Sequence, residues 1–377
     1  MTLTASMMSL RSMAAARAAT ISAARSLSQK KPQRGATHVL LLHDGWPRSE
    51  FYARAALSAE ARAFYNLPDK LPFDLPQWLI PKKVSECMEE YGKHGDVQET
   101  VMEPLTNALG DTVLRIMPEL ESVNVTAASP FEAPTIEHAV RGILDSGAGR
   151  LVIMPLQPHF GCSRSGLLIN EAARALSSLS APSHESPTAR IVHGTATSTE
   201  LSTLERWSTH PVMSNLWSSR LEAARSSIDA VLFVAPVLRG FGRRDYERSV
   251  YASAERTISE TRVPLPWRVA FFNGWNQWDL PVVEGIGSGL RQLKEKRVAV
   301  VPITSIVPSF DTISILPKAL VGRPHVELLK PEVNSILIQG MAEALRNHLL
   351  GRRSGQLQLR CTGCFRNDCQ RTRELLA

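Results

Sequence analysis

The chain of 377 residues lacks any run of eighteen apolar residues, which is about the length that a helix needs to cross a lipid bilayer. Cysteine is scarce: only five are present, and an odd number argues against a framework of disulfides. Acidic residues are absent before Asp44, although six lysines and arginines precede it. These absences exclude a membrane-spanning protein and argue against a small disulfide-rich one.

The basic N-terminal segment explains most of the positive charge. The net charge is +7, and six of the excess positive charges lie before Asp44. The rest of the chain is therefore near neutral, so we expect no nucleic-acid partner. A segment rich in Ala, Ser, Met and Arg without acidic residues is typical of a mitochondrial transit peptide, and we predict one over residues 1–35. A disordered cytosolic tail is the alternative. With a transit peptide, the mature protein works in the mitochondrial matrix.

Short apolar runs alternate with segments of helical period along the rest of the chain. This alternation predicts an α/β protein with parallel sheets that are buried on both faces. The runs form two sets, which predicts two Rossmann-like lobes with parallel four-stranded sheets, over residues 36–195 and 196–350. The runs are residues 38–43, 123–127, 150–156, 190–192, 230–235, 269–272, 298–303 and 326–329.

Ligands in such folds bind beyond the carboxyl ends of the strands. A candidate cleft should therefore be lined by the loops that begin at His43, Leu156, Pro236, Asn273 and Ile303.

A separate segment, residues 64–83, is interrupted by prolines yet is more apolar than a loop needs to be. It predicts either a cap on the core or an exposed lip for a membrane face or an apolar ligand.

Three of the five cysteines, Cys361, Cys364 and Cys369, lie in the C-terminal extension of residues 351–377 with the spacing C-x2-C-x4-C. Two cysteines around a short turn can direct both thiolates at one metal, and a third can close over the same centre. A fourth ligand must come from Cys87 or Cys162. The spacing favours an iron–sulfur cluster, with a structural zinc site as the alternative. A thioredoxin-like site is disfavoured because its C-x-x-C belongs at a strand-to-helix junction.

Several segments together resemble the ferrochelatases, which insert ferrous iron into protoporphyrin to make haem. Residues 42–47 (LHDGWP) are similar to the leading strand and Gly-Pro turn of that family, and residues 207–210 (WSTH) to its Trp-Pro-Thr-His turn. Residues 156–166 (LQPHFGCSRSG) resemble its Tyr-Ser-Cys-Ser-Thr-Thr-Gly loop, and residues 277–281 (QWDLP) its Pro-Trp-Leu-Gly-Pro loop. The C-terminal cysteines match the animal-type version, which carries a 2Fe-2S cluster.

The resemblance implies a fold, a set of ligands and a setting. The fold is that of the type II chelatases, the substrates are ferrous iron and a porphyrin, and haem is a further ligand. The cysteine of the resembling loop is Cys162, which supplies the fourth cluster ligand and leaves Cys87 as a core residue. The family also implies a homodimer with peripheral contact to the inner mitochondrial membrane. Phe131, Phe160 and Trp278 would bind the porphyrin, with Trp207 as a further wall, and packing in the core is the alternative for these aromatic residues.

The residues that handle protons and metal depart from the family pattern. The catalytic His of the family falls on Pro236, which cannot accept a proton, and its catalytic Glu falls on Asp311. His210 would either bind a cation or cap the helix that follows it. Metal insertion needs a proton acceptor, and Pro236 cannot be one, so two interpretations stay open. One is a divergent enzyme that uses Asp311 and a displaced histidine, which could be His43, His159 or His210. The other is a catalytically inactive homologue that binds porphyrin or haem, or forms a structural subunit of a mitochondrial complex.

Overall fold

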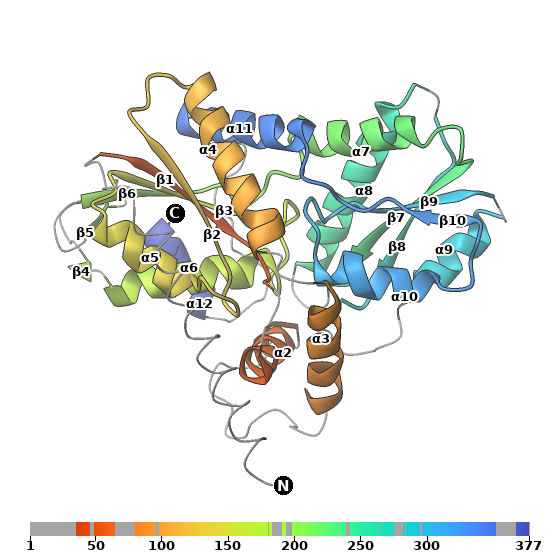
Figure 1. The fold of residues 1–377 in the computed structure, drawn as a ribbon, viewed down its shortest axis with the longest axis horizontal. Helices are drawn as coiled ribbons and strands as arrows, with labels where there is room; N and C mark the ends of the chain where they lie inside the picture. The colour runs from red at the N-terminus through yellow and green to blue at the C-terminus, as the bar shows by residue number, and fades with distance from the viewer. Residues whose placement is uncertain are drawn as a thin grey trace, which may run out of the picture.

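A computed structural model of the chain contains two β-sheets, each covered by helices on both faces and each forming one lobe (Figure 1). The predicted α/β class with two lobes built on parallel sheets is therefore confirmed. The structure describes residues 35–45, 49–64, 80–94, 98–179, 181–182, 191–193, 198–238, 242–262, 264–274, 282, 284–294, 296–351 and 367–376.

The first sheet has four parallel strands and two short strands that extend one edge in the antiparallel sense. The parallel strands pair in register, with Thr37 beside both Val123 and Arg150. In spatial order the strands are β2 (Val123–Ala128), β1 (Thr37–Leu42), β3 (Arg150–Pro155), β6 (Ser198–Thr203), β5 (Ile191–His193) and β4 (Ala181–Pro182).

Strand β1 shows why this sheet needs helices on both faces. All six of its residues are buried, and successive side chains point to opposite sides. Val39 and Leu41 belong to the core on one face, whereas Leu40 and Leu42 belong to the core on the other. The first face is covered by α4 (Glu103–Ile116), and the second by α5 (Ile136–Asp145), α6 (Ser165–Leu179) and α12 (Asn367–Leu376).

The second sheet is built in the same way from four parallel strands. In spatial order they are β10 (Val326–Leu328), β9 (Val298–Pro302), β7 (Ala230–Pro236) and β8 (Trp267–Phe272). One face is covered by α9 (Ile286–Gln292) and α10 (Leu316–Leu320), and the other by α7 (Pro211–Ala223), α8 (Arg243–Ser259) and α11 (Ser335–Leu349).

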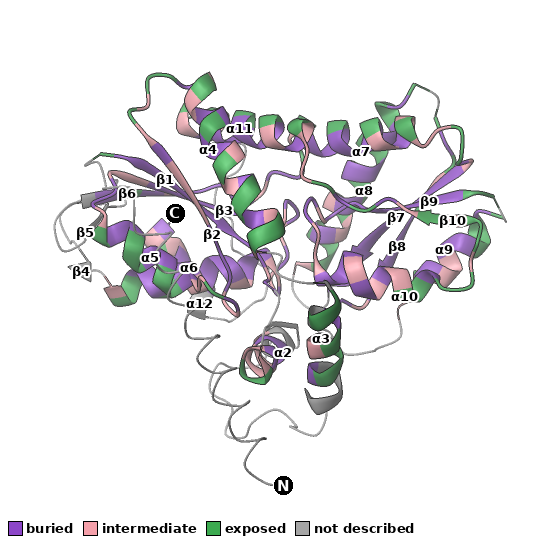
Figure 2. Ribbon diagram, viewed as in Figure 1, coloured by how far each residue is buried: buried purple, intermediate pink, exposed green. Residues whose placement is uncertain are grey.

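One apolar core joins the two lobes. Helix α11 packs against α4 of the first lobe and α7 of the second, and lies along the same side of the molecule as both (Figure 1). Its close approach to α7 requires a glycine, because a Cβ atom at Gly340 would collide with Val212. Buried residues concentrate in the central strands of both sheets and on the helix faces turned toward them (Figure 2). This shared core fixes where the two sheets end relative to each other.

Strand β6 corrects the boundary predicted between residues 195 and 196. The predicted boundary places residues 198–203 (STELST) in the second lobe, but they pair in parallel with β3 and complete the first sheet. The run at residues 190–192 gives only the short antiparallel strand β5. Polar side chains hide the strand in the sequence, yet Thr199 is buried and donates to the Ala148 carbonyl at 2.7 Å.

Helices α2 (Glu50–Phe64) and α3 (Ile80–His94) pack against each other and lie below the two sheets in the view of Figure 1. Glu90 of α3 pairs with Lys318 of α10 at 3.1 Å, which ties α3 to the second lobe. The predicted lip over residues 64–83 lies mostly outside the described residues. None of the described helices has the length and apolar character that a membrane crossing requires.

Trp207 is a core residue that holds the end of β3. It lies between β6 and α7, is fully buried, and donates from Nε1 to the Pro155 carbonyl at 2.9 Å. Its backbone N–H reaches the Pro158 carbonyl at 3.3 Å. The structure therefore supports the core interpretation of Trp207, and its contacts position the loop that follows β3.

Replacing Trp207 with Phe should lower the free energy of unfolding by about 1–3 kcal/mol, because the buried Pro155 carbonyl loses its donor. Urea unfolding followed by circular dichroism measures the change. Tyr251→Phe is the control. Because Tyr251 is 38% exposed on α8, this substitution should lower the free energy of unfolding by no more than about 0.5 kcal/mol. Equal stability of Trp207→Phe and the wild type would contradict the role of this hydrogen bond.

Candidate functional site

A cavity of about 60 Å³ lies where the carboxyl ends of both sheets meet. Its walls come from the loop after β1, the loop after β3, the end of β7 at Pro236, and residues 304–311 after β9. These are four of the five loops that the sequence predicted for the cleft. The fifth loop, which begins at Asn273, is described only as far as Gly274.

Asp311 supplies a buried carboxylate to this cavity. It opens the short π-helix η3 (Asp311–Ile315) and is only 3% exposed. The turn before it is fixed by Ser309 and Thr312, since the Ser309 N–H donates to Thr312 Oγ1 at 2.9 Å. Burial of a carboxylate is costly without a cationic partner. The loop therefore holds Asp311 where it must meet a cation.

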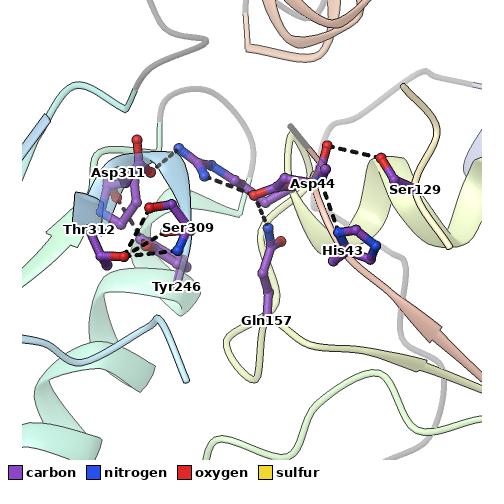
Figure 3. Close-up of polar contacts among 11 residues, drawn as sticks. His43, Asp44, Ser129, Gln157, Tyr246, Ser309, Asp311 and Thr312 are labelled. Atoms are coloured by element: carbon purple, nitrogen blue, oxygen red, sulfur yellow. Dashed lines mark hydrogen bonds and ion pairs between the residues drawn. The ribbon is translucent and has the colours of Figure 1, made fainter. Parts of the chain in front are cut away.

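That cation is the guanidinium of Arg164, which contacts two carboxylates at once. Its Nη2 lies 3.2 Å from Asp311 Oδ2, and its Nη1 lies 3.3 Å from Asp44 Oδ2. Asp44 and Asp311 stand on opposite sides of this contact, because one follows β1 and the other follows β9 (Figure 3). The bridge from Asp44 through Arg164 to Asp311, called here the arginine bridge, joins the two lobes across the cleft.

Asp44 is held by several further groups. Gln157 Nε2 donates to Asp44 Oδ2, and the backbone carbonyl of Asp44 accepts from Ser129 Oγ at 3.2 Å (Figure 3). Burial raises the pKa of Asp44 above its ordinary value; Arg164 opposes this effect and the negative charge of Asp311 adds to it. Asp44 therefore takes up a proton more readily than an exposed aspartate does.

Gly274 explains how the guanidinium fits between the lobes. A Cβ atom at this position would collide with Arg164 Nη2 and lie 3.2 Å from Asp311 Oδ2. Gly274 follows β8, so the loop after β8 packs against the arginine bridge. The bridge is thus surrounded by loops that follow strands of both sheets.

Two of the three histidines that could have entered the cleft do line the cavity, namely His43 and His159. His43 Nδ1 accepts from the Gly45 N–H at 3.2 Å, so its Nε2 carries the proton in the neutral ring. Burial lowers the pKa of His43 to about 4, against an opposing contact with Gln98.

His159 has the same tautomer as His43. Its Nε2 lies 2.9 Å from Ser253 Oγ. The Ser253 hydroxyl donates its own proton to the Ser208 carbonyl at 3.2 Å, so toward the ring it acts as an acceptor. With the hydroxyl donating to Ser208, Nε2 carries the proton and Nδ1 keeps its lone pair, which has no hydrogen-bond partner among the described residues. Burial lowers the pKa of His159 to about 3, so the ring is neutral at physiological pH.

Several predicted site residues lie elsewhere. His210 does not line the cavity; it caps α7, where its Nδ1 accepts from the Val212 N–H at 3.3 Å. Phe160 lies under the Arg206 guanidinium at 4.5 Å from its ring centre, and Phe131 packs against the shared core. Neither phenylalanine lines the cavity. Trp278 is outside the described residues.

The predicted cluster ligands fall partly within the described chain. Cys162 lies in the loop just before α6, and Cys369 is buried on α12, which packs against α6. Asn170 of α6 donates from Nδ2 to Cys369 Sγ at 3.5 Å. Cys361 and Cys364 are outside the described residues. Within the described ranges no three metal-ligating side chains converge on one point.

Sequence reasoning missed Asp44 and Arg164 as site residues. Each did carry a signal, because each places a charged residue in a segment that resembles a loop of the family. Asp44 stands in the leading Gly-Pro turn, and Arg164 stands at the first Thr of the Tyr-Ser-Cys-Ser-Thr-Thr-Gly loop. Charged residues of opposite sign at two loops that end neighbouring strands indicate an ion pair.

Comparison with known proteins gives a family match over most of the chain. The family model described as Ferrochelatase matches residues 39–314. "Ferrochelatase, mitochondrial" of Bos taurus is 23% identical over 402 residues, which cover 96% of this chain and 90% of that protein. The Xenopus laevis protein of the same name is 21% identical over 372 residues, which cover 90% of this chain and 85% of that protein.

Two solved structures also align with the chain over most of its length. SirB from Bacillus subtilis with Fe3+ aligns with a TM-score of 0.47 at 11% identity, over 85% of this chain and 98% of that one. CbiX, described as the terminal enzyme for biosynthesis of sirohaem in denitrifying bacteria, aligns with a TM-score of 0.44 at 15% identity, over 83% and 98%.

Proposed function

Because the chain belongs to the ferrochelatase family, we propose that it binds a porphyrin and a ferrous ion at the cleft between its lobes and inserts the metal into the ring. The observation that carries this proposal is the buried carboxylate of Asp311 in the cavity at the carboxyl ends of both sheets. A carboxylate in such a place favours a cation beside it. The described residues thus supply the end of the site that handles the metal.

Insertion of a ferrous ion into a porphyrin forms bonds from the metal to the ring nitrogens and releases two pyrrole protons, so the site needs a metal carrier and a proton acceptor. Asp311 is the residue to which we assign the metal. Pro236 lines the cavity at the position of the family base, but it has no basic atom. We assign uptake of the first proton to Asp44, because burial raises its pKa, whereas the pKa values of His43 and His159 are lowered; the second proton passes to water.

A second function is favoured by two observations. Pro236 replaces the base, and Arg164 already occupies one oxygen of Asp311. A homologue of this kind would bind porphyrin or haem without inserting metal, as a carrier or as a subunit of a mitochondrial complex. The two functions differ in one product, haem.

The purified protein, supplied with ferrous ion and protoporphyrin under anaerobic conditions, tests both functions. Insertion predicts that the porphyrin absorption bands are replaced by those of haem faster than in a sample without protein. A porphyrin spectrum that shifts on binding but never becomes that of haem would instead support the second function. A spectrum that protein leaves entirely unchanged would contradict both.

We also propose that Cys162, Cys361, Cys364 and Cys369 hold a 2Fe-2S cluster. Two contacts support this proposal for the described residues. Helix α12 packs along α6, which places Cys369 beside Asn170 in the second turn of the helix that Cys162 precedes. From Ser165 to Asn170 the helix rises only about 8 Å. When bound, such a cluster supplies a one-electron redox centre and ties the C-terminal extension to the loop after β3.

The surroundings of Cys369 suit a metal-bound thiolate. Thr372 Oγ1 donates to Asn170 Oδ1 at 2.6 Å, which fixes the amide so that Nδ2 faces the sulfur. Hydrogen bonds to cluster sulfurs raise the reduction potential by stabilising the more negative state. Asn170 and Thr372 therefore position a donor that a merely structural core cysteine would not need.

We further propose a mitochondrial location. The basic leader over residues 1–35 supports import into the matrix, and the relatives from cattle and frog are named as mitochondrial proteins. A homodimer and a peripheral contact with the inner membrane, through the apolar segment 64–83, complete the proposal.

A further inference from the structure

We infer that Arg164 competes with the divalent metal ion for Asp311, so that metal binding requires the contact between Arg164 and Asp311 to break. This inference rests on the proposed use of the cleft for a metal ion and adds a control on that binding. The arginine bridge is then the resting state of the site, and Arg164 sets how tightly the site takes up a metal.

Charge balance is the first support. Two carboxylates share one guanidinium, so the bridge as a whole carries one negative charge. Moving Arg164 away would leave two negative charges facing a small cavity, and a divalent cation is the species that neutralises them. The side chain of Arg164 is only 11% exposed and that of Asp311 4%, so water does little to screen this competition.

The form of the contact is the second support. Each of the two Nη atoms reaches a different carboxylate, at 3.2 and 3.3 Å, instead of making the paired short bonds of a bidentate arginine. The guanidinium is also pressed by the Gly274 backbone, which leaves no room for a Cβ atom. Arg164 thus spreads these contacts over both carboxylates.

His159 is the third support, and it points to a ligand independently of the acidic residues. It lines the same cavity, is only 2% exposed, and its Nδ1 has no hydrogen-bond partner among the described residues. A buried neutral imidazole with an unused lone pair suits a transition-metal ion.

Binding of Mn²⁺, followed by loss of the free-ion signal in electron paramagnetic resonance, tests the inference without porphyrin. Mn²⁺ prefers oxygen and nitrogen ligands, so the cysteines interfere little. The Arg164→Gln variant should bind Mn²⁺ at least tenfold more tightly than the wild type, and Asp311→Asn in the same chain should remove this gain. Arg174→Gln is the matched control on the helix that follows Arg164, where the arginine is 60% exposed and pairs with a neighbouring glutamate; its affinity should equal that of the wild type.

Gly274→Ala provides a second variant that keeps the arginine. Its added methyl group displaces Nη2 from Asp311, so it should also tighten Mn²⁺ binding, by severalfold. Circular dichroism confirms that each variant is folded. Mn²⁺ affinities of Arg164→Gln and Gly274→Ala equal to or weaker than that of the wild type, or no binding by any of the proteins, would overturn the inference. Because no porphyrin is present, failure of metal insertion alone would leave this result unaffected.

Discussion

Replacing Asp311 with Asn should reduce the rate of ferrous ion insertion by about a hundredfold to a thousandfold. The substitution keeps the size of the side chain but removes the charge that we assign to holding the metal, and buried electrostatic groups of this kind contribute effects of that order. The initial rate of haem formation from ferrous ion and protoporphyrin under anaerobic conditions measures the loss. Asp311→Glu restores the residue type of the resembling family and should retain most of the rate.

The matched control for Asp311 is Asp229→Asn. Asp229 directly precedes β7 and pairs with Arg297, which precedes β9, so it is an ion-paired aspartate at the opposite edge of the same sheet. The Asp229 side chain is 45% exposed, and the Asp229→Asn substitution should leave the insertion rate unchanged. Insertion by Asp311→Asn at the wild-type rate would show that another group carries the metal.

The second large effect is expected at the cysteines. Serine at Cys162 should abolish the 2Fe-2S cluster, because a hydroxyl does not replace the thiolate in a four-ligand site. The same result is expected for Cys361, Cys364 and Cys369. The wild-type protein should be brown and contain iron and acid-labile sulfide, and each serine variant should be colourless. Visible absorption and iron and sulfide analysis of the purified proteins measure the difference.

Two further variants sharpen the cluster prediction. Cys87→Ser is the control, since Cys87 is the cysteine left out of the predicted ligand set, and this variant should keep the cluster. Asn170→Leu should also keep it but lower its midpoint potential, because Nδ2 no longer donates to Cys369 Sγ. A colourless wild-type protein with one zinc ion per chain would contradict the cluster and establish the zinc alternative.

The scaffold of the site could be predicted from the sequence because that scaffold rests on short-range patterns. Continuous apolar runs such as residues 150–156 and 298–303 correspond to β3 and β9, and parallel strands end at a common edge. The loops at His43 and Leu156 could therefore be assigned to one cleft from the order of apolar and polar residues alone. Both contribute to the cavity wall.

The arginine bridge could not be predicted in this way. Arg164 lies 120 residues from Asp44 and 147 residues from Asp311, so their contact is set by packing of the lobes and by no local pattern. The lack of a side chain at Gly274 gains meaning only once the guanidinium is seen against it. His159 is similar, since its unused Nδ1 follows from the neighbouring Ser253.

Two other differences have simpler physical reasons. Strand β6 is polar, and its Thr199 satisfies a buried carbonyl, so apolar periodicity misses it. His210 precedes a proline that opens α7, a position where a side-chain acceptor for the helix N–H groups is favourable, and its Nδ1 makes this cap. The predicted porphyrin contacts of Phe131 and Phe160 stay predictions, as does that of Trp278.

The most direct test of a metal site in the cleft is an anomalous difference map from crystals of the protein soaked with Co²⁺. We expect a peak within bonding distance of Asp311, with the Arg164 guanidinium moved away from that carboxylate. Peaks confined to other parts of the molecule, with Arg164 still bridging Asp44 and Asp311, would contradict the account.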